Sequence, residues 1–173
     1  MTTVLVTGPI GGGKSEACRH IAGRGWPVYD CDSRCKALYS EVPGLRARIE
    51  EELGIPFDQL HRIFTDKELR LRLEALVYPL LVEDLLAWKA SLQSPLAFVE
   101  SAIAGEKPQF DGLYDKVLLI TAPLPERIAR NPEAARRSAI QSFRRTRPER
   151  TIRNNTTVES LHDKLDKYLK TLI

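Results

Sequence analysis

The stretch Gly8-Pro9-Ile10-Gly11-Gly12-Gly13-Lys14-Ser15 decides the fold of this chain. Its spacing matches G-x-x-x-x-G-K-[ST], in which glycines let the backbone curl so that successive N–H groups point at one chain of phosphates. In that geometry Lys14 reaches the β- and γ-phosphates of a nucleotide, and the Ser15 hydroxyl is a ligand of Mg²⁺. The sequence therefore predicts a nucleotide site at this loop.

The residues on either side of the loop supply the context that such a motif requires. Val4-Leu5-Val6 precede the loop as a short β-prone run, and residues 16–22 place Ala17, Cys18 and Ile21 on one helical face. A helix that begins there also points the positive end of its dipole at the phosphates. An ordinary glycine-rich turn is the structural alternative, and the flanking strand and helix favour the nucleotide site.

Length and composition limit the classes of protein that fit. A chain of 173 residues buries one core, so we expect a single domain over residues 1–173. No apolar stretch is long enough to cross a bilayer, and the N-terminus lacks a signal-peptide pattern, so we expect a cytoplasmic protein without a membrane partner. The three cysteines lack the paired spacing of a zinc site and are expected to be reduced structural thiols.

Acidic residues follow two predicted strands. Residues 26–29 form a short strand that leads into Asp30 and Asp32, and residues 95–99 form a buried strand that Glu100 follows. Ligands of open α/β sheets bind at the carboxyl ends of the strands, so Asp30 and Asp32 are expected beside the phosphate loop if the strands are adjacent and parallel. Helix capping is the alternative role for Asp32. Glu100 is expected to act on Mg²⁺ through water or to bond to the loop backbone.

The middle of the chain, residues 42–92, has a helical pattern with interruptions at residues 54–56 and before Pro79. A helical insertion between strands fits this pattern, at about residues 40–92, and we expect it to form the wall of an acceptor site. Tyr78 lies in this insertion and is a candidate for substrate contact, although a lone tyrosine is more often structural.

A basic segment follows the strand predicted at residues 116–121, and it accounts for much of the net charge of +3. Arginines next to a phosphate loop form a lid whose guanidinium groups bind phosphates, and we place this lid at about residues 123–148. A solvated basic face and a nucleic-acid patch are the alternatives. Nucleic acid is disfavoured because Phe143 alone is available for base stacking among the arginines.

The loop, residues 27–33 and Lys36 together resemble the dephospho-CoA kinase family, and the resemblance runs through nearly the whole chain. It implies a P-loop NTPase fold: a three-layer α/β/α arrangement with a mostly parallel central sheet, a helical insertion and a reduced lid. It also implies ATP- and Mg²⁺-dependent phosphorylation of the ribose 3′-hydroxyl of dephospho-CoA, the last step of coenzyme A biosynthesis. The expected partner is therefore a small molecule, and the oligomeric state is left open.

The resemblance assigns roles to individual residues. Asp32 activates the acceptor hydroxyl, Lys14 holds the transferred phosphate, and Arg130 offsets charge in the transition state. The residues expected to bind ATP are Gly8, Gly11, Gly12, Gly13, Lys14, Ser15, Glu16 and Asn154, with Ser15 as the metal ligand. The residues expected to meet the acceptor are Asp30, Lys36, Tyr78, Glu100 and Glu106.

The chain also departs from the family pattern. Tyr78 stands where the family usually has histidine, Glu16 stands where a small hydroxyl residue is common, and only Glu106 survives from a motif at residues 102–106. Between Arg130 and Gln141 the lid is short by roughly two helical turns. Two alternatives therefore remain: a related small-molecule or nucleoside monophosphate kinase, and an ATP-binding paralogue with weak or no kinase activity.

Overall fold

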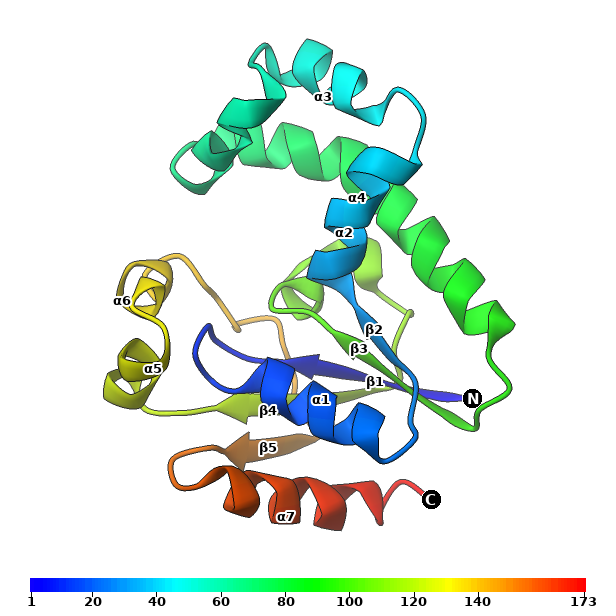
Figure 1. Cartoon of the computed structure of the whole chain (residues 1–173), viewed down its shortest axis with the longest axis vertical. Helices are drawn as coiled ribbons and strands as arrows, with labels where there is room; N and C mark the ends of the chain where they lie inside the picture. The colour runs from blue at the N-terminus through cyan, green and yellow to red at the C-terminus, as the bar shows by residue number, and fades with distance from the viewer. The chain divides into compact units, whose positions relative to one another are not determined.

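A computed structural model describes residues 1–173 and contains one five-stranded sheet flanked by helices (Figure 1). The strands lie in the order β2-β3-β1-β4-β5, and every neighbouring pair is parallel. This arrangement confirms the predicted α/β fold with a mostly parallel sheet. The strands are β1 (Thr2–Thr7), β2 (Val28–Asp30), β3 (Leu96–Glu100), β4 (Lys116–Thr121) and β5 (Arg150–Arg153).

Glu100, rather than Asp30, ends the strand that lies next to β1, the strand before the phosphate loop. Asp30 and Asp32 were expected beside the phosphate loop on the condition that their strand, β2, is adjacent to β1. This condition is not met, because β3 lies between β2 and β1. Glu100 instead ends the strand that pairs directly with β1, opposite Val6. Asp30 pairs in register with Glu100 on the other side of β3. The order of the strands thus brings Glu100 one strand closer to the loop than Asp30.

The chain divides into two compact units. The sheet unit consists of Met1–Asp30 and Leu92–Ile173, and the helical unit consists of Cys31–Ser91. The sheet unit carries α1 (Lys14–Gly23), the short 3-10 helices η2 (Ala104–Glu106) and η3 (Pro108–Phe110), α5 (Leu124–Arg130), α6 (Glu133–Arg137) and α7 (Val158–Leu169). The helical unit carries α2 (Cys31–Glu41), α3 (Leu45–Leu53), the 3-10 helix η1 (Phe57–Phe64) and α4 (Lys67–Ser91).

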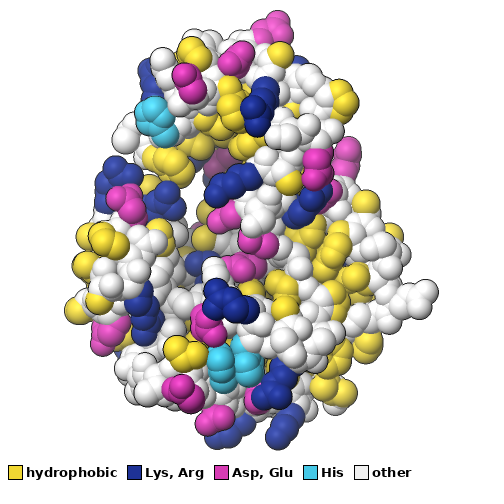
Figure 2. All heavy atoms as spheres, viewed as in Figure 1, with side chains coloured by type: hydrophobic (Ala, Val, Ile, Leu, Met, Phe, Trp, Pro, Cys, Tyr) yellow, Lys and Arg dark blue, Asp and Glu magenta, His cyan; other side chains and the backbone are white.

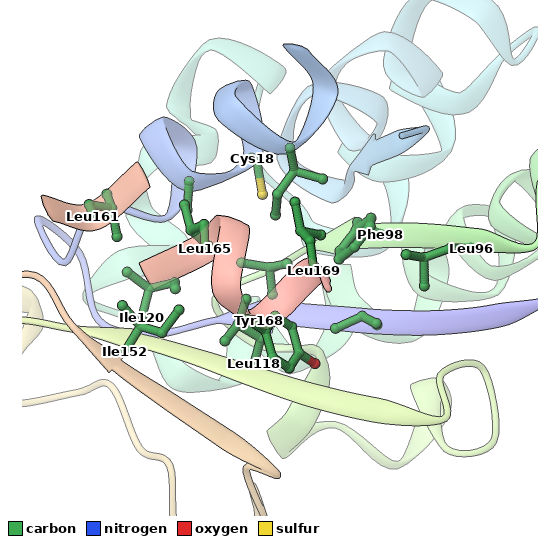
Figure 3. Close-up of a cluster of buried hydrophobic side chains, with 14 residues drawn as sticks. Cys18, Leu96, Phe98, Leu118, Ile120, Ile152, Leu161, Leu165, Tyr168 and Leu169 are labelled. Carbon is green, nitrogen blue, oxygen red and sulfur yellow. The ribbon is translucent and has the colours of Figure 1, made fainter. Parts of the chain in front are cut away.

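The core of the sheet unit fixes α1, the helix that follows the phosphate loop. Figure 3 shows α1 and α7 contributing apolar side chains to one cluster over the sheet. Phe98 and Leu165 are fully buried in this cluster, and Ile21 of α1 is equally buried. Burial of a side chain of this size stabilises the fold by about 1.5 to 3 kcal/mol. The start of α1, and with it the loop, is therefore held by a well-packed core.

Within the helical unit, α2 and α4 are joined by an ion pair. The Arg34 guanidinium donates to both carboxylate oxygens of Asp84, at 3.0 and 2.8 Å. The predicted interruption before Pro79 is wrong, because α4 continues through this residue. A proline inside a helix loses one hydrogen bond and costs about 3 kcal/mol. Burial of Val77 and Leu81 on the same helix offsets this cost, and Pro79 itself is exposed.

Candidate nucleotide-binding site

The predicted phosphate loop connects β1 to α1, which confirms the strand and helix expected on either side of it. Gly8 has a φ of +145°, and a Cβ atom there would lie 1.9 Å from the carbonyl oxygen of Ile120. Only glycine therefore fits where the chain leaves β1. Gly13 occupies the position before the first residue of α1. The loop amides and the N-terminus of α1 together form the kind of site that binds phosphate.

Lys14 lies over the loop that precedes it. Its ammonium group donates a hydrogen bond to the carbonyl oxygen of Gly8 at 2.9 Å and a longer one to that of Pro9 at 3.5 Å. Lysine has three rotatable donors on a flexible stem, so the group can exchange carbonyl oxygens for phosphate oxygens without movement of the backbone.

Ser15 meets a carboxylate from the neighbouring strand. Its hydroxyl donates a hydrogen bond to Glu100 Oε1 at 2.8 Å. Burial raises the pKa of the nearby Cys18 thiol, and the charge of Glu100 raises it further, so this thiol stays protonated. All three cysteines of the chain are free. Ser15 and Glu100 thus place two oxygen atoms together at the carboxyl edge of the sheet.

Arg130 and Asn154 hold the carbonyl groups of the loop. Arg130 donates from Nη1 to Gly11 O at 3.2 Å and from Nη2 to Asn154 O at 2.9 Å. The Asn154 side chain donates from Nδ2 to Gly12 O at 3.0 Å and is buried. The structure therefore brings both predicted residues to the loop, where they bond to its backbone.

Gln141 is a loop contact that the site prediction left out. Its Oε1 atom accepts a hydrogen bond from the Ile10 backbone N–H at 3.0 Å. The two residues are 131 positions apart in the chain. In the sequence, Gln141 only marked the end of the shortened lid, because no local signal linked this side chain to the loop.

Glu16 and Glu106, two other predicted site residues, bond to the protein itself. Glu16 pairs with Arg19, and its Oε1 lies 2.9 Å from His162 Nε2 of α7. Glu106 accepts from the backbone N–H of Arg145 at 3.0 Å and from both the N–H and the hydroxyl of Thr146 at 2.8 and 2.7 Å. Partial desolvation opposes ionisation of Glu106, but these hydrogen bonds outweigh it and lower its pKa. Their predicted ligand contacts stay predictions.

The helical unit holds the remaining predicted residues, Asp32, Lys36 and Tyr78. Asp32 and Lys36 are exposed and four residues apart on α2, so they share one face of that helix. Tyr78 is buried in α4, and this burial, followed by the charge of Glu74, raises its pKa. The charge of Asp32 also acts on Tyr78, so α2 and α4 bring these two side chains into one electrostatic environment.

Membrane-spanning helices and preformed metal clusters are both absent from the structure. None of the helices has the length and apolar character needed to cross a membrane. No group of three or more histidine, cysteine, aspartate or glutamate side chains is arranged to hold a metal ion.

A parallel sheet, with a glycine-rich loop after its first strand and with Lys14 and Ser15 at the start of the next helix, defines a P-loop nucleotide-binding protein. The family model described as dephospho-CoA kinase matches residues 2–158 of the chain. The chain belongs to the dephospho-CoA kinase family.

Individual relatives agree with this assignment. The dephospho-CoA kinase of Porphyromonas gingivalis is 33% identical over 132 residues, covering 71% of this chain and 65% of that relative. The dephospho-CoA kinase of Thermus thermophilus is 31% identical, covering 97% of this chain and 88% of the relative. The crystal structure of TT1252 from Thermus thermophilus superposes with a TM-score of 0.81 at 28% identity and covers 99% of this chain and 98% of that one.

Proposed function

We propose that the chain transfers the γ-phosphoryl group of ATP to the ribose 3′-hydroxyl of dephospho-CoA. Membership of the dephospho-CoA kinase family supports this reaction over that of a related small-molecule or nucleoside monophosphate kinase. The observation that carries the proposal is the phosphate loop, in which the Lys14 ammonium bonds to Gly8 O and the Ser15 hydroxyl bonds to Glu100. An ATP-binding paralogue without activity is disfavoured because the similar curated relatives are themselves dephospho-CoA kinases.

ATP binds along the loop in this proposal. The backbone N–H groups of residues 13–15 and the Lys14 ammonium hold the β- and γ-phosphates, because donors at a helix N-terminus favour negative charge. The carbonyl groups of Gly11 and Gly12 face Arg130 and Asn154. These two side chains therefore keep the loop in the shape that presents its N–H groups.

Mg²⁺ fits the residues at the sheet edge. The site offers Ser15 Oγ and Glu100 Oε1, which are 2.8 Å apart, and hard oxygen ligands are those that Mg²⁺ prefers. Protein sites for this ion commonly supply only one or two ligands, since phosphates and water complete the shell. The absence of a larger acidic cluster is consistent with such a site. When bound, the ion neutralises charge on the β- and γ-phosphates.

Asp32 accepts the proton of the acceptor hydroxyl, and that oxygen forms its bond to the γ-phosphorus. The bond from the γ-phosphorus to the oxygen that bridges it to the β-phosphorus breaks, and ADP leaves with the electron pair. Lys14 and the loop amides stabilise the charge that develops on the phosphate oxygens. Lys36 shares the helix face of Asp32 and is assigned to the acceptor, together with Asp30, Tyr78 and Glu106 as further contacts to be tested.

Asp32→Asn tests this assignment, with Asp58→Asn as the control because Asp58 is also an exposed aspartate of the helical unit. ADP formation is measured with ATP, Mg²⁺ and dephospho-CoA, and with other nucleosides and small alcohols as acceptors. Loss of a general base is expected to lower kcat about 100- to 10,000-fold while ATP binding persists. ADP at the background rate in the parent protein would refute the proposed function, and a preference for another acceptor would replace its substrate.

We also propose the partners and the cellular location of the enzyme. Small-molecule substrates follow from the family, whereas the lack of nucleic-acid partners and the cytoplasmic location rest on the sequence. The division into one kinase domain with an acceptor-side insertion at about 40–92 and a lid at about 123–148 is likewise a proposal.

A further inference from the structure

Glu16 is an acidic residue in the first turn of α1, the turn that also carries Lys14 and Ser15. The N-terminus of a helix favours negative charge, and the proposed function places the phosphates of the nucleotide there. A carboxylate that branches from the same turn competes with these phosphates for the donors and repels their charge. Nucleotide binding at this loop therefore depends on where the Glu16 carboxylate is held.

Both oxygen atoms of the Glu16 carboxylate have partners. Oε2 pairs with Arg19 of the same helix, and Oε1 lies 2.9 Å from Nε2 of His162 on α7. The Arg19 side chain is 72% exposed, and an exposed pair at this spacing within one helix contributes little. His162 reaches Glu16 from a different helix, so it is the partner that directs the carboxylate toward α7.

The ring of His162 is held in turn by His20 of α1. The two rings are stacked, with their centroids 4.0 Å apart and their planes at 17°. Figure 2 shows the histidine side chains of α1 and α7 side by side, with acidic and basic side chains around them. The His20 side chain is only 11% exposed, so the stack fixes the His162 ring against a well-placed neighbour.

Asp166 of α7 anchors the far end of the stack. His20 Nε2 lies 2.8 Å from Asp166 Oδ1, and Arg24 Nε donates to the same oxygen at 3.0 Å. The bond from His20 outweighs partial desolvation and, together with Arg24, lowers the pKa of Asp166, so this carboxylate stays ionised. An ionised carboxylate only accepts hydrogen bonds, so His20 donates from Nε2. The same rule makes His162 the donor to Glu16.

We propose that His162 is a positioning residue of the nucleotide site. It holds the Glu16 carboxylate toward α7, so that this carboxylate does not compete with the nucleotide phosphates at the start of α1. The inference deepens the proposed function and rests on it for the identity of the nucleotide. Direct contact between Glu16 and ATP is the alternative, and it predicts that loss of the Glu16 charge weakens ATP binding.

Four variants and one combination test this role. His162→Phe keeps a flat ring for the stack on His20 but removes the donor to Glu16, whereas His162→Gln keeps an N–H donor. Glu16→Gln removes the charge and is also combined with His162→Phe. Asp166→Asn is the matched control, because it weakens the same contact between α1 and α7 without releasing Glu16.

Two measurements are made on each protein. Calorimetry without an acceptor gives the affinities for ATP and AMP in the presence of Mg²⁺, at low and at high KCl. Thermal unfolding without nucleotide gives the melting temperature. Neither measurement depends on the identity of the acceptor.

His162→Phe is expected to weaken ATP binding about 3- to 30-fold, the scale of a like charge released near phosphates in a largely exposed site. AMP carries less phosphate charge and should lose less. The ratio of parent to variant affinity should fall at high KCl, because salt screens the repulsion. His162→Gln should recover most of the affinity, and Glu16→Gln should cancel the effect of His162→Phe. Asp166→Asn should lower the melting temperature but leave ATP affinity near that of the parent.

Unchanged ATP affinity in His162→Phe would overturn the inference, and so would a loss that persists when Glu16→Gln is added. An equal loss in Asp166→Asn would also overturn it, because packing of α7 on α1 would then explain both variants. Weaker ATP binding in Glu16→Gln alone would establish direct contact with the ligand instead. A parent protein that binds ATP but does not phosphorylate dephospho-CoA would refute the proposed function alone.

Discussion

The phosphate loop and the basic segment differ in how far residue type and spacing predict function. In the loop, residues 8–15, function follows from local spacing, because glycines at fixed positions set the backbone and Lys14 and Ser15 follow at once. In the basic segment, residues 124–149, arginines of identical chemistry have different partners. Arg130 bonds to backbone oxygens, Arg145 pairs with Asp111, and two guanidinium nitrogens of Arg127 have no partner. Residue type therefore identifies the loop but does not predict which partners each arginine has.

The two regions also differ in how they are anchored. The loop is held at both ends by β1 and α1, whose apolar residues Val6 and Ile21 are fully buried. The basic segment has only two short helices, and residues 138–149 connect α6 to β5 without a helix or strand. Side-chain bonds such as those of Glu106 hold that stretch. Changes in the loop should therefore affect catalysis, and changes in the anchors of the basic segment should affect stability.

Within these two regions, the largest effect is expected from Lys14→Ala. The ammonium group lies over the loop, 2.9 Å from Gly8 O, and makes no contribution to the apolar core. We expect kcat/KM to fall about 100- to 1000-fold, as for other removed donors to developing charge, with little change in melting temperature. Steady-state kinetics and thermal unfolding measure the two quantities. Lys167→Ala on the exposed face of α7 is the control.

Equal turnover and equal ATP affinity in Lys14→Ala and the parent would show that the loop is not the active site. Such a result would also remove the contrast between the two regions, because neither would then be identified by its sequence.

A smaller effect is expected from Glu100→Gln. The carboxylate accepts the Ser15 hydroxyl bond at 2.8 Å, and its charge favours a divalent cation at the same place. Loss of a group that orients a metal ligand commonly costs 10- to 100-fold in metal affinity or activity, and we expect about that loss at low Mg²⁺ with partial recovery at high Mg²⁺. A Mg²⁺ titration of the initial rate gives the answer. Glu159→Gln, an exposed glutamate of α7, serves as the control.

If the Mg²⁺ dependence of Glu100→Gln matched that of the parent, Glu100 would be a purely structural partner of Ser15. Magnesium binding at this sheet edge would then depend on Ser15 and on the nucleotide alone.

Local patterns in the sequence predicted most of the elements near the loop. The strand predicted at residues 116–121 coincides with β4, and the strand and helix around the loop have the expected types. These predictions succeed because β-branched runs and helical periodicity depend on near neighbours. The continuous helix at Pro79 was not predicted, because burial of residues from several turns of α4 overrides a local cost.

Contacts between distant parts of the chain account for what the sequence did not reveal. The order of the strands, which puts Glu100 rather than Asp30 on the strand beside β1, depends on the crossover connections. The bond from the Ile10 N–H to Gln141 spans 131 positions. The different hydrogen bonding of Arg127 and Arg130 likewise depends on which carbonyl groups the fold brings to α5. None of these features leaves a periodic or local signal in one sequence.

The smallest effect, and the one that tests the anchoring of the basic segment, is expected from Glu106→Gln. Glu106 accepts bonds from Arg145 and from both donors of Thr146. An amide retains one acceptor oxygen, so the loss in free energy of unfolding is expected to be about 1 kcal/mol at pH 7. Urea denaturation measures it, with Glu51→Gln on the exposed face of α3 as the control.

The pH dependence of this difference gives a sharper test. The pKa of Glu106 is lower in the folded protein than its ordinary value of 4.5, so the unfolded state binds the proton more readily. The stabilisation from ionised Glu106 is therefore fully present above about pH 4.5 and is lost as the pH falls through the lower pKa of the folded state. The stabilities of the parent and Glu106→Gln should approach each other in acid. A difference that stays constant down to the acid transition would mean that packing, rather than the carboxylate charge, anchors the basic segment.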